Sequence, residues 1–448
     1  MRKYADYLPA QAAWLDELPS HWQCKKIGAL FSERKSKVSD KDYAPLSVAR
    51  IGVVPQLATA VKTDAGDNRK LVCAGDFVIN SRSDRKGSCG VAELDGSVSL
   101  INIVLTPRNG LNERYVHYLL RSQPFSEEYY RNGRGIVADL WTTRYSEMKS
   151  ILLPVPPCDE QDQIVRFLDW KVSSINKLIR IRKRRIEELE AIKRSSIGYL
   201  VMGQAQSIPQ RGTAVSWVKT IPAHWNEKSL IQVAEEQQIK NAGMVEDNLL
   251  SLSYGKIINK DIKTTDGLLP SSFEGYQIVH DGNIILRLTD LQNDHKSLRT
   301  GLVTQTGIIT SAYTCLNVRH NILPEYLQLQ LHVADLCKVF YGMGGGVRQS
   351  IGFKEIRKLV IAIPPVEEQQ HILDRVHSIE KPINCAIQNS RDIIAELENL
   401  KMRLISDTVT GQIDVRGIEI PEYEFVDEDN DNVDEKLEQG ADEPPEEE

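Results

Sequence analysis

The chain repeats its own layout, and this duplication constrains the fold more than any other feature of the sequence. Three pairs of segments match in order, 18–22 with 221–225, 156–164 with 364–372, and 188–204 with 396–412, at shifts of 203, 208 and 208 residues. Between them five positions match at a shift of 211: Gly90, Gly96, Tyr115, Gly133 and Gly135 with Gly301, Gly307, Tyr326, Gly344 and Gly346. A colinear series of this length predicts two copies of one fold.

Each copy begins with a β-rich part, over about 20–155 and 223–363. Short apolar runs such as Phe77–Ile79 alternate with Gly, Asp and Asn, a pattern typical of strands joined by turns. A helix is expected near 113–121 and its equivalent near 324–336. The pattern therefore predicts a mixed α/β domain in each half.

A helical part closes each copy, at 156–205 and at 364–416. The N-cap serine at Ser173 and the proline at Pro382 predict that a long helix restarts at the same repeat position in both copies. From there apolar residues recur every three or four positions over about 29 residues. A single stripe of this kind usually packs on its own domain, but two copies pair most economically with each other as an antiparallel coiled coil.

The net charge of −7 hides an uneven distribution. Residues 421–448 hold fourteen Asp and Glu against Lys436, a charge of −13, which leaves +6 on the other 420 residues. A segment so poor in apolar side chains cannot offset the entropy of ordering, so we expect 417–448 to be disordered. With 41% hydrophobic residues, no membrane-length apolar run and no signal peptide over Met1–Tyr7, a cytoplasmic globular protein is expected.

These motifs resemble those of the specificity subunit of type I restriction-modification systems. The resemblance rests on Pro156-Pro157-x-x-Glu160-Gln161 and its copy at 364–369, on the two Pro-x-x-Trp segments, and on Val409–Arg416. It implies an α+β fold with two pseudo-repeated mixed α/β target-recognition domains, separated by two long helices paired as an antiparallel coiled coil. The first copy departs from the pattern after Gln204, where no Asp-Val-Arg follows.

The resemblance also implies a domain layout and a set of partners. The domains are 1–155 and 206–363 for target recognition, 156–205 and 364–416 for the helical regions, and 417–448 for the acidic tail. Such a subunit is not an enzyme: it reads a split sequence in double-stranded DNA and docks two methyltransferase subunits, and through them restriction and translocase subunits. S-adenosylmethionine, ATP and Mg²⁺ are expected on those partners, and no cofactor on this chain.

The residues themselves give no sign of catalysis. An adenine methyltransferase needs Asn or Asp before Pro-Pro, where this chain has Val155 and Ile363. The glycines at 342–346 lack the strand and helix context of a cofactor loop. The histidines lack metal-ligand spacing, and the seven cysteines form no Cys-x-x-Cys. We therefore expect no catalytic or metal site.

Base reading needs hydrogen-bonding side chains at base edges, whereas Lys and Arg on phosphates supply affinity without sequence information. Two polar, basic loops in each half interrupt the apolar pattern and differ between the copies. The candidates are Ser81, Arg82, Ser83, Arg85, Lys86, Arg134, Thr142, Thr143 and Arg144 in the first half, and Arg287, Thr289, Lys296, Arg299, Arg348, Gln349 and Ser350 in the second. For each residue the alternative is an ordinary solvated turn.

Two further interpretations stay open. A basic run at 180–185 is as consistent with pairing to Glu187 and Glu188, or with docking of a partner, as with DNA contact. The whole chain also fits a pseudo-symmetric interaction scaffold, or orphan subunit, without DNA specificity. A self-contained methyltransferase-nuclease is disfavoured by the missing motifs.

Overall fold

The computed structural model describes residues 2–56, 66–108, 110–135, 141–204, 208–261, 272–291, 294, 297–319, 321–343 and 351–427. The chain forms two compact units. Unit 1 comprises Met1–Arg184 and Ser390–Glu448, and unit 2 comprises Arg185–Asn389. Both unit boundaries fall inside long helices, so the domain boundaries expected from the sequence stay predictions.

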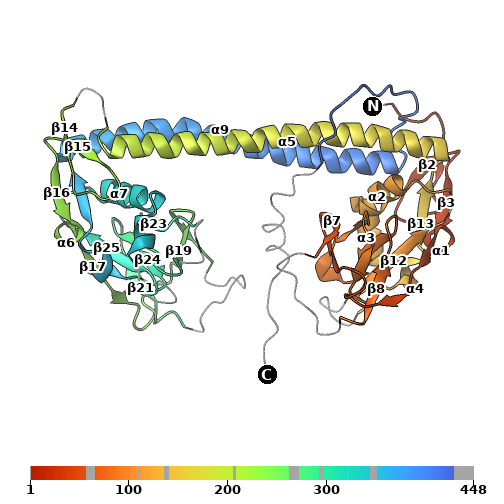
Figure 1. Cartoon of the computed structure of the whole chain (residues 1–448), viewed down its shortest axis with the longest axis horizontal. Helices are drawn as coiled ribbons and strands as arrows, with labels where there is room; N and C mark the ends of the chain where they lie inside the picture. The colour runs from red at the N-terminus through yellow and green to blue at the C-terminus, as the bar shows by residue number, and fades with distance from the viewer. Residues whose placement is uncertain are drawn as a thin grey trace. The chain divides into compact units, whose positions relative to one another are not determined.

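Unit 1 is built from short antiparallel strands (Figure 1). A four-stranded sheet has the order β10-β9-β12-β4, a three-stranded sheet the order β11-β8-β5, and three further pairs are β6-β7, β13-β3 and β1-β2. The strands are β1 (Tyr7–Pro9), β2 (Glu17–Pro19), β3 (Gln23–Lys26), β4 (Phe31–Glu33), β5 (Lys37–Val38), β6 (Leu46–Ala49), β7 (Gly52–Pro55), β8 (Arg69–Val72), β9 (Phe77–Asn80), β10 (Cys89–Val91), β11 (Gly96–Val98), β12 (Asn102–Pro107) and β13 (Leu152–Val155).

Unit 2 repeats this strand order. Its sheets are β23-β22-β25-β17 and β24-β21-β18, with the pairs β19-β20, β26-β16 and β14-β15. The strands are β14 (Gln210–Gly212), β15 (Thr220–Pro222), β16 (Asn226–Ser229), β17 (Ala234–Gln237), β18 (Ile239–Lys240), β19 (Leu250–Ser253), β20 (Lys256–Asn259), β21 (Gln277–Val279), β22 (Ile284–Leu286), β23 (Thr300–Leu302), β24 (Gly307–Ile309), β25 (Thr314–Val318) and β26 (Val360–Ile363).

Short helices complete each unit. Unit 1 has α1 (Ile27–Leu30), η1 (Ser83–Arg85), α2 (Glu113–Arg121), α3 (Gln123–Arg131) and α4 (Tyr145–Met148), and unit 2 has α6 (Leu230–Val233), α7 (Pro324–Leu336), η3 (Val339–Gly342) and α8 (Phe353–Ile356). The helices expected near 113–121 and 324–336 are thus present. α2 packs beside β10 and α7 beside β23, which buries Tyr115 and Tyr326 completely.

Two pairs of repeated glycines lie where strands approach other backbone or buried leucines closely. A Cβ on Gly96 would come within 2.6 Å of the Ala44 carbonyl oxygen, and one on Gly307 within 2.5 Å of the Asn248 carbonyl oxygen. Real Cβ atoms do not approach so closely, so only glycine fits these positions without a shift of the neighbouring backbone. Gly90 and Gly301 likewise face the hairpins β6-β7 and β19-β20 at close range.

Two helices of 44 residues each, α5 (Cys158–Val201) and α9 (Val366–Val409), contribute to both units. The helix restart expected at Ser173 and Pro382 is wrong, because both helices run through these positions. Ser174 donates its hydroxyl to the Trp170 carbonyl within the helix, at 2.8 Å, instead of capping a new one. Pro382 lies inside α9, so the helix tolerates the loss of one N–H donor there.

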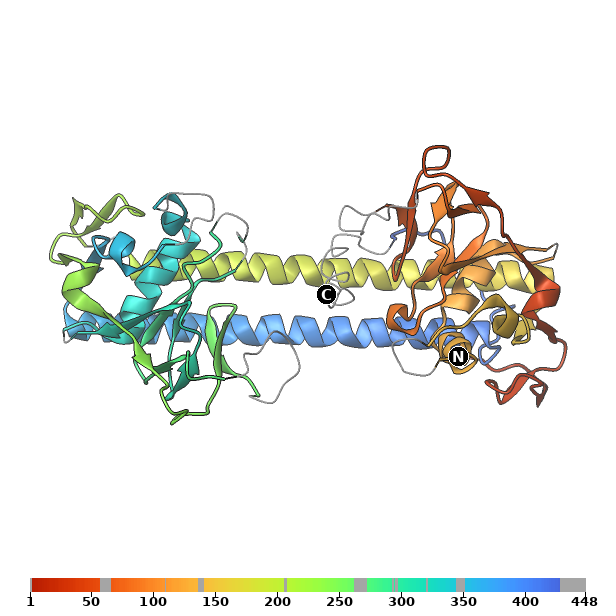
Figure 2. The ribbon, with the colours of Figure 1, turned by 90° about the horizontal axis from the view of Figure 1, so that it is seen from below.

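Within each unit, a segment of α5 lies beside a segment of α9 (Figures 1 and 2). In unit 1 the Lys401 Nζ donates to Asn176 Oδ1 at 3.3 Å. In unit 2 the Lys193 Nζ donates to Asn384 Oδ1 at 3.0 Å, and it also pairs with Glu380 at 3.1 Å. Both the lysines and the asparagines are related by the repeat shift of 208. Each helix therefore offers one lysine and one asparagine to the other.

The Pro-Pro motifs begin α5 and α9, and their glutamates hold the repeated tryptophans. Glu160 is 4% exposed and accepts hydrogen bonds from Tyr4 Oη at 2.5 Å and Trp22 Nε1 at 3.1 Å, while His21 Nε2 lies at 2.7 Å. Burial and this hydrogen bond raise the pKa of Tyr4. In unit 2, Glu368 accepts from Trp225 Nε1 at 3.0 Å with His224 at 2.8 Å.

The glutamine that follows each glutamate joins the long helix to the sheet domain. Gln161 accepts from the Asn112 N–H at 2.9 Å, directly before α2, and Gln369 accepts from the Leu323 N–H at 2.8 Å, directly before α7. The Glu-Gln dipeptide is thus a structural joint in both units. It explains why this part of the sequence repeats so closely.

The end of each long helix closes the other unit. Tyr115 donates to the Val409 carbonyl at the end of α9 at 3.3 Å, and Tyr326 donates to the Val201 carbonyl at the end of α5 at 3.2 Å. Gly411 and Gly203 follow with φ of +77° and +63°. Each unit therefore contains the start of one long helix and the end of the other.

The chain beyond α9 packs on unit 1 as far as Asp427. Ser173 Oγ donates to the Glu424 carbonyl at 2.9 Å and accepts from the Val426 N–H at 2.6 Å. The expectation of disorder therefore does not hold for 417–427, which we call the strap. Residues 428–448, the rest of the segment expected to be disordered, lie outside the described residues.

We expect Gly411→Ala to destabilise unit 1 by about 1–3 kcal/mol. The positive φ disfavours any side chain, and a Cβ would lie 2.5 Å from Pro19 Cδ. The measurement is the urea midpoint of the full chain. Gly417→Ala is the control, because a Cβ there meets open space; equal midpoints for the two variants would contradict this account of the joint.

Candidate nucleic-acid interface

The first predicted loop of unit 1 connects β9 to β10 as a hairpin. The strands pair from Phe77↔Val91 to Ile79↔Cys89, and the loop is closed by the Asn80 N–H donating to the Ser88 carbonyl at 3.0 Å. Asn80 Oδ1 accepts from the Arg82 N–H at 3.0 Å, which turns the chain into η1. The loop is therefore attached to a fully buried strand at its base.

The second predicted loop is bound to the first by backbone hydrogen bonds. Thr142 exchanges two bonds with Arg134, at 3.0 and 2.9 Å, and Thr142 also bridges Arg82 in antiparallel fashion. The Ser83 N–H donates to the Trp141 carbonyl at 3.0 Å, and the Thr143 N–H to the Ser81 carbonyl at 2.9 Å. The two loops thus form one small sheet-like surface, although paired residues such as Arg82 and Thr142 lie 60 positions apart in the chain.

The bridges place the candidate side chains on opposite faces of this surface. Residues directly opposite in an antiparallel pair share a face, so Arg82, Thr142 and Arg134 project to the same side. The two arginines are exposed and Thr142 is half-buried. Thr143 points inward: it is fully buried and donates its hydroxyl to the Tyr129 carbonyl at 3.0 Å. The prediction that the Thr143 side chain contacts DNA is therefore wrong, because this side chain is buried and supports the loop.

The other candidates of unit 1 surround these three residues. Arg85 and Lys86 are exposed, Ser81 and Ser83 are half-buried, and Arg144 is exposed at the start of α4. Asp84 lies 3.5 Å from Arg82 and 3.8 Å from Arg85, long distances between exposed groups that contribute little energy. The surface is therefore positive but retains one carboxylate among the arginines.

The sequence reasoning missed a residue beside this surface. Arg50 occupies the tip of the β6-β7 hairpin, is exposed, and donates Nε to the Lys86 carbonyl at 3.3 Å. In unit 2 the equivalent hairpin β19-β20 has Tyr254 at its tip, 87% exposed and with φ of +47°. A two-residue turn between two short strands is the sequence signal that could have revealed these hairpin tips. It is clearest at Tyr254-Gly255, where a glycine occupies the turn.

Arg299, a candidate in unit 2, is an internal support and not a surface group. Its side chain is fully buried. The guanidinium donates to the carbonyls of Arg287 and Thr289 at 3.1 and 2.8 Å and to Tyr341 Oη at 3.0 Å, and it also bonds the Asp290 and Asp294 carbonyls. A guanidinium has five donors, and a loop that curls around it can satisfy all of them. The prediction that Arg299 contacts DNA is thus wrong, because its side chain is buried inside the loop.

The remaining candidates of unit 2 are partly described. Arg287 is half-buried and pairs with Asp294 at 3.4 Å, and Thr289 is half-buried with its carbonyl held by Arg299. Lys296, Arg348, Gln349 and Ser350 lie outside the described residues. Directly after them the Ile351 N–H donates to the Leu288 carbonyl at 3.0 Å. This bond joins the two loops of unit 2 as Thr143 and Ser81 join those of unit 1.

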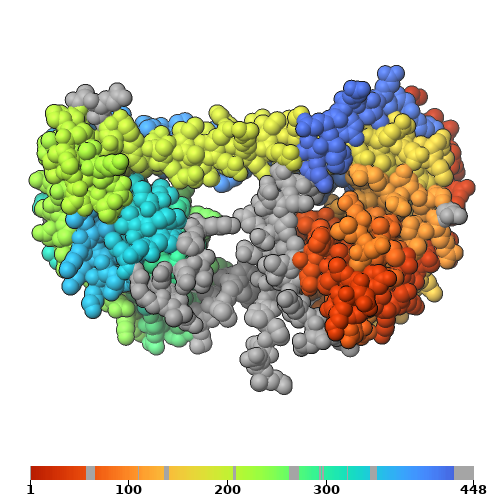
Figure 3. All heavy atoms as spheres, viewed as in Figure 1, coloured from red at the N-terminus to blue at the C-terminus, as the bar shows by residue number. Residues whose placement is uncertain are grey.

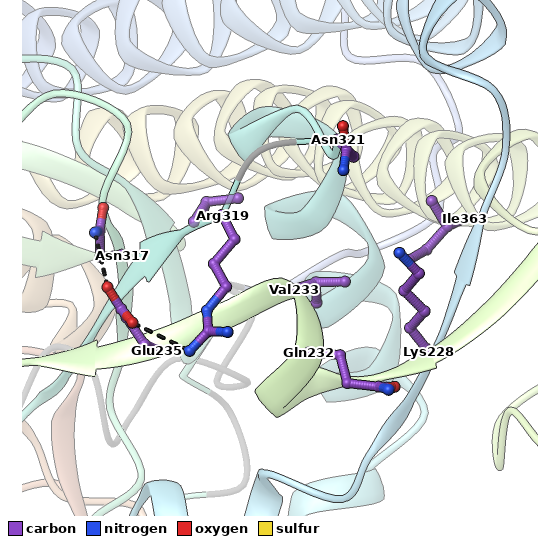
Figure 4. A pocket seen from close by; sticks show the side chains of 9 residues that line it. Lys228, Gln232, Val233, Glu235, Asn317, Arg319, Asn321 and Ile363 are labelled. Atoms are coloured by element: carbon purple, nitrogen blue, oxygen red, sulfur yellow. Dashed lines mark hydrogen bonds and ion pairs between the residues drawn. The ribbon is translucent and has the colours of Figure 1, made fainter.

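A polar hollow of about 380 Å³ in unit 2 is shown in Figure 4. Arg319 pairs there with Glu235 at 3.1 Å, and Asn317 donates to the same carboxylate at 3.4 Å. Its lining holds no cysteine, serine or histidine. In the part of the chain that the structure describes, no group of His, Cys, Asp and Glu is arranged to hold a metal ion.

The helices were also compared with the length and hydrophobicity of a membrane-spanning helix. Among the described residues, no helix has the length and apolar character needed to cross a membrane.

Known proteins of one kind are similar to this chain. Residues 301–399 match the family described as the type I restriction modification DNA specificity domain. A chain of Methanocaldococcus jannaschii, provisionally named the type I restriction enzyme MjaX specificity subunit, is 22% identical over 430 residues, which cover 90% of this chain and 96% of that one. These matches confirm the resemblance seen in the sequence motifs.

Solved structures are also similar to this chain. A chain solved in work on complex assembly and conformational transition of the type I R-M system has a TM-score of 0.61 at 15% identity, covering 88% of this chain and 99% of that one. The HsdS subunit of Thermoanaerobacter tengcongensis has a TM-score of 0.43 at 15% identity, covering 88% and 98%. The first of these has the same mixed α/β fold.

We expect Arg299→Ala to lower the free energy of unfolding by about 2–4 kcal/mol, because it leaves several buried carbonyls without a donor. Urea unfolding of the full chain measures this. Arg82→Ala is the control, since its side chain is exposed and lies 3.5 Å from the exposed Asp84, and it should change stability by less than about 0.5 kcal/mol. Similar losses for both variants would show that Arg299 has no special structural role.

Proposed function

We propose that this chain, which resembles type I restriction-modification specificity subunits, is the non-catalytic subunit that selects the DNA sequence for such a complex. The observation that carries the proposal is the repeated architecture. Two units have the same strand order, and each binds its two polar loops together at the same backbone positions. A chain built twice around a loop pair suits a DNA target with two half-sites.

In unit 1 the reading surface consists of Arg82, Thr142 and Arg134. An arginine can donate two hydrogen bonds to the O6 and N7 of guanine in the major groove, and a threonine can contact a base edge or a thymine methyl group. Arg50, Arg85 and Lys86 lie around these three and supply phosphate contacts. The rigid attachment of both loops to β9 keeps the side chains in register with the bases.

In unit 2 the corresponding surface is built on Arg287 and Thr289, with the Tyr254 hairpin tip beside them. Gly255 of this hairpin packs against Leu298, which belongs to the loop that follows Arg287 and Thr289. A Cβ on Gly255 would lie 3.2 Å from Leu298 Cβ, so the hairpin and the loop are neighbours. The different side chains at equivalent positions, Arg50 and Tyr254 among them, give the two half-sites different sequences. Lys296, Arg348, Gln349 and Ser350 belong to this surface in the proposal.

α5 and α9 act as the spacer between the half-sites, paired as an antiparallel coiled coil. A helix of 44 residues is about 66 Å long, against roughly 34 Å for one turn of B-DNA. The lysine–asparagine contacts specify the alignment, because a polar pair at one position of an apolar seam disfavours every shifted register.

The helices also bind the partner subunits. Exposed apolar side chains on them are available to a partner; they are Leu178, Ile181, Ile192, Tyr199, Leu400 and Met402. Two methyltransferase subunits dock there and bring S-adenosylmethionine, and restriction and translocase subunits join through them with ATP and Mg²⁺. This chain binds none of these cofactors itself.

Arg82→Ala and Arg134→Ala are expected to relax specificity in one half of the split target, at a cost of about 1–3 kcal/mol each. Arg287→Ala should relax the other half. The measurement is selection from a random DNA library by the assembled complex, followed by binding of single-base variants. Lys86→Ala, a phosphate contact in the proposal, is the comparison and should weaken all sequences alike.

Two results would contradict this assignment. If Arg82, Arg134 and Arg287 weakened every sequence equally, they would be phosphate contacts. If the complex showed no sequence preference at any salt concentration, the chain would be an interaction scaffold without specificity of its own.

Ile192→Ser is expected to weaken binding of the methyltransferase subunit about tenfold, because an apolar side chain in a protein interface contributes about 1–2 kcal/mol. Titration calorimetry or fluorescence anisotropy would measure the affinity. Arg194→Ser, two residues away and on a different face of α5, is the matched control. Equal affinities for both variants would place the docking surface elsewhere.

A further inference from the structure

The strap runs along α5 in the same direction as the helix. Gln163 donates to the Ile418 carbonyl at 2.8 Å, and 13 residues later Asn176 donates to the Val426 carbonyl at 3.1 Å. Ser173 lies between them and holds both Glu424 and Val426. Figure 3 shows this segment as dark blue atoms lying on the yellow helix.

The strap leads onto a basic stripe of the same helix. Positions three, four, seven and eight residues apart share a helix face. Beyond Ser173 and Asn176 that face carries Lys177, Arg180, Lys183 and Arg184. Arg180 and Arg184 are exposed and Lys183 is half-buried.

The first contact between this stripe and the acidic end of the chain is already in place. The Lys177 Nζ lies 2.9 Å from Glu424 Oε2. The hydrogen bond to Lys177, and after it the charges of Lys177 and Arg180, lower the pKa of Glu424. Arg184 lies eight residues past Asn176, or about 12 Å along the helix. A few residues beyond Asp427 are enough to reach it.

Residues 428–448 have the charge that such a stripe would bind. They contain eleven Asp and Glu against Lys436. At 21 residues, the segment can extend up to about 70 Å. Its length therefore does not limit the contact. The strap that precedes it already reaches Lys177 through Glu424.

The second copy of the helix supplies an internal comparison. The repeat shift of 208 puts Cys385, Gln388, Arg391 and Asp392 at the positions of Lys177, Arg180, Lys183 and Arg184. The first copy thus has four cations where the second has one cation and one anion. Likewise, Lys381 and Asn384, the equivalents of Ser173 and Asn176, are exposed, whereas the strap buries Ser173 and Asn176. The basic stripe occurs in the copy that carries the strap.

We propose that residues 428–448 bind the basic stripe Lys177, Arg180, Lys183 and Arg184 of α5, and that they compete there with the phosphates of DNA. The strap positions the acidic segment, and electrostatic attraction holds it. The intramolecular contact rests on the strap, on the basic stripe and on the acidic composition of 428–448, whereas the competition with DNA also rests on the proposed function. The competition would reduce binding to non-target sequences, which depends mostly on phosphate contacts.

Trypsin cleavage at Lys436 tests the contact without any DNA. In the full chain at about 50 mM salt we expect cleavage about tenfold slower than at 0.5 M salt, because ion pairs weaken as salt screens them. Arg180→Gln/Lys183→Gln/Arg184→Gln should remove this protection. Lys354→Gln/Arg357→Gln/Lys358→Gln removes three exposed cations of unit 2 and should retain it. Equal cleavage in the two variants and the wild type would overturn the contact.

Binding to a non-target duplex tests the competition. Truncation after Asp427 should raise the affinity for that duplex about tenfold at 50 mM salt in the wild type. In the Arg180→Gln/Lys183→Gln/Arg184→Gln background the same truncation should have clearly less effect. An equal gain in both backgrounds would mean that the tail acts only through net charge, and would overturn the competition.

The outcomes separate this proposal from the proposed function. Protection of Lys436 with no gain in DNA affinity on truncation would support the contact and overturn the competition. Loss of sequence-specific binding by the assembled complex would count against the proposed function, whereas the trypsin result does not depend on it.

Discussion

Two carboxylates, Glu160 buried and Glu368 half-buried, determine how the long helices join the sheet domains. Glu160 and Glu368 each stand in the first turn of a helix, where the free N–H groups favour a negative charge. Each also accepts the indole N–H of a tryptophan from the start of its unit. Glu160 is 4% exposed, so the loss of its partners would leave a buried charge uncompensated. These bonds attach the start of each sheet domain to the first turn of its long helix.

The sequence predicted the architecture better than the surfaces. The duplicated motifs indicated two similar mixed α/β parts and two long helices, because such motifs mark joints and close packing that each copy needs. The helix restart at Ser173 and Pro382 was wrong for a physical reason: a serine can bond back to its own helix or to a passing strap, as Ser174 and Ser173 do, and capping is only one of its uses.

The candidate site was predictable as loops but not as individual side chains. Arg82 and Arg299 look alike in the sequence, since both follow or precede a strand within a polar run. Only the curl of the chain around the Arg299 guanidinium makes one a support and leaves the other exposed. Thr142 and Thr143 differ by one residue, and the alternation of a strand sends one outward and the other inward. Neither distinction has a local sequence signal.

The way the units are closed also sets an order of assembly during synthesis. Unit 2 is one continuous segment, Arg185–Asn389, and its core needs nothing made later. The core of unit 1 includes Leu404, Val409, Ile413 and Val415 together with Tyr4 and Leu18. Domains fold as their residues leave the ribosome, so unit 1 stays incomplete until its last helix arrives. The half that is translated first is therefore the half that finishes folding last.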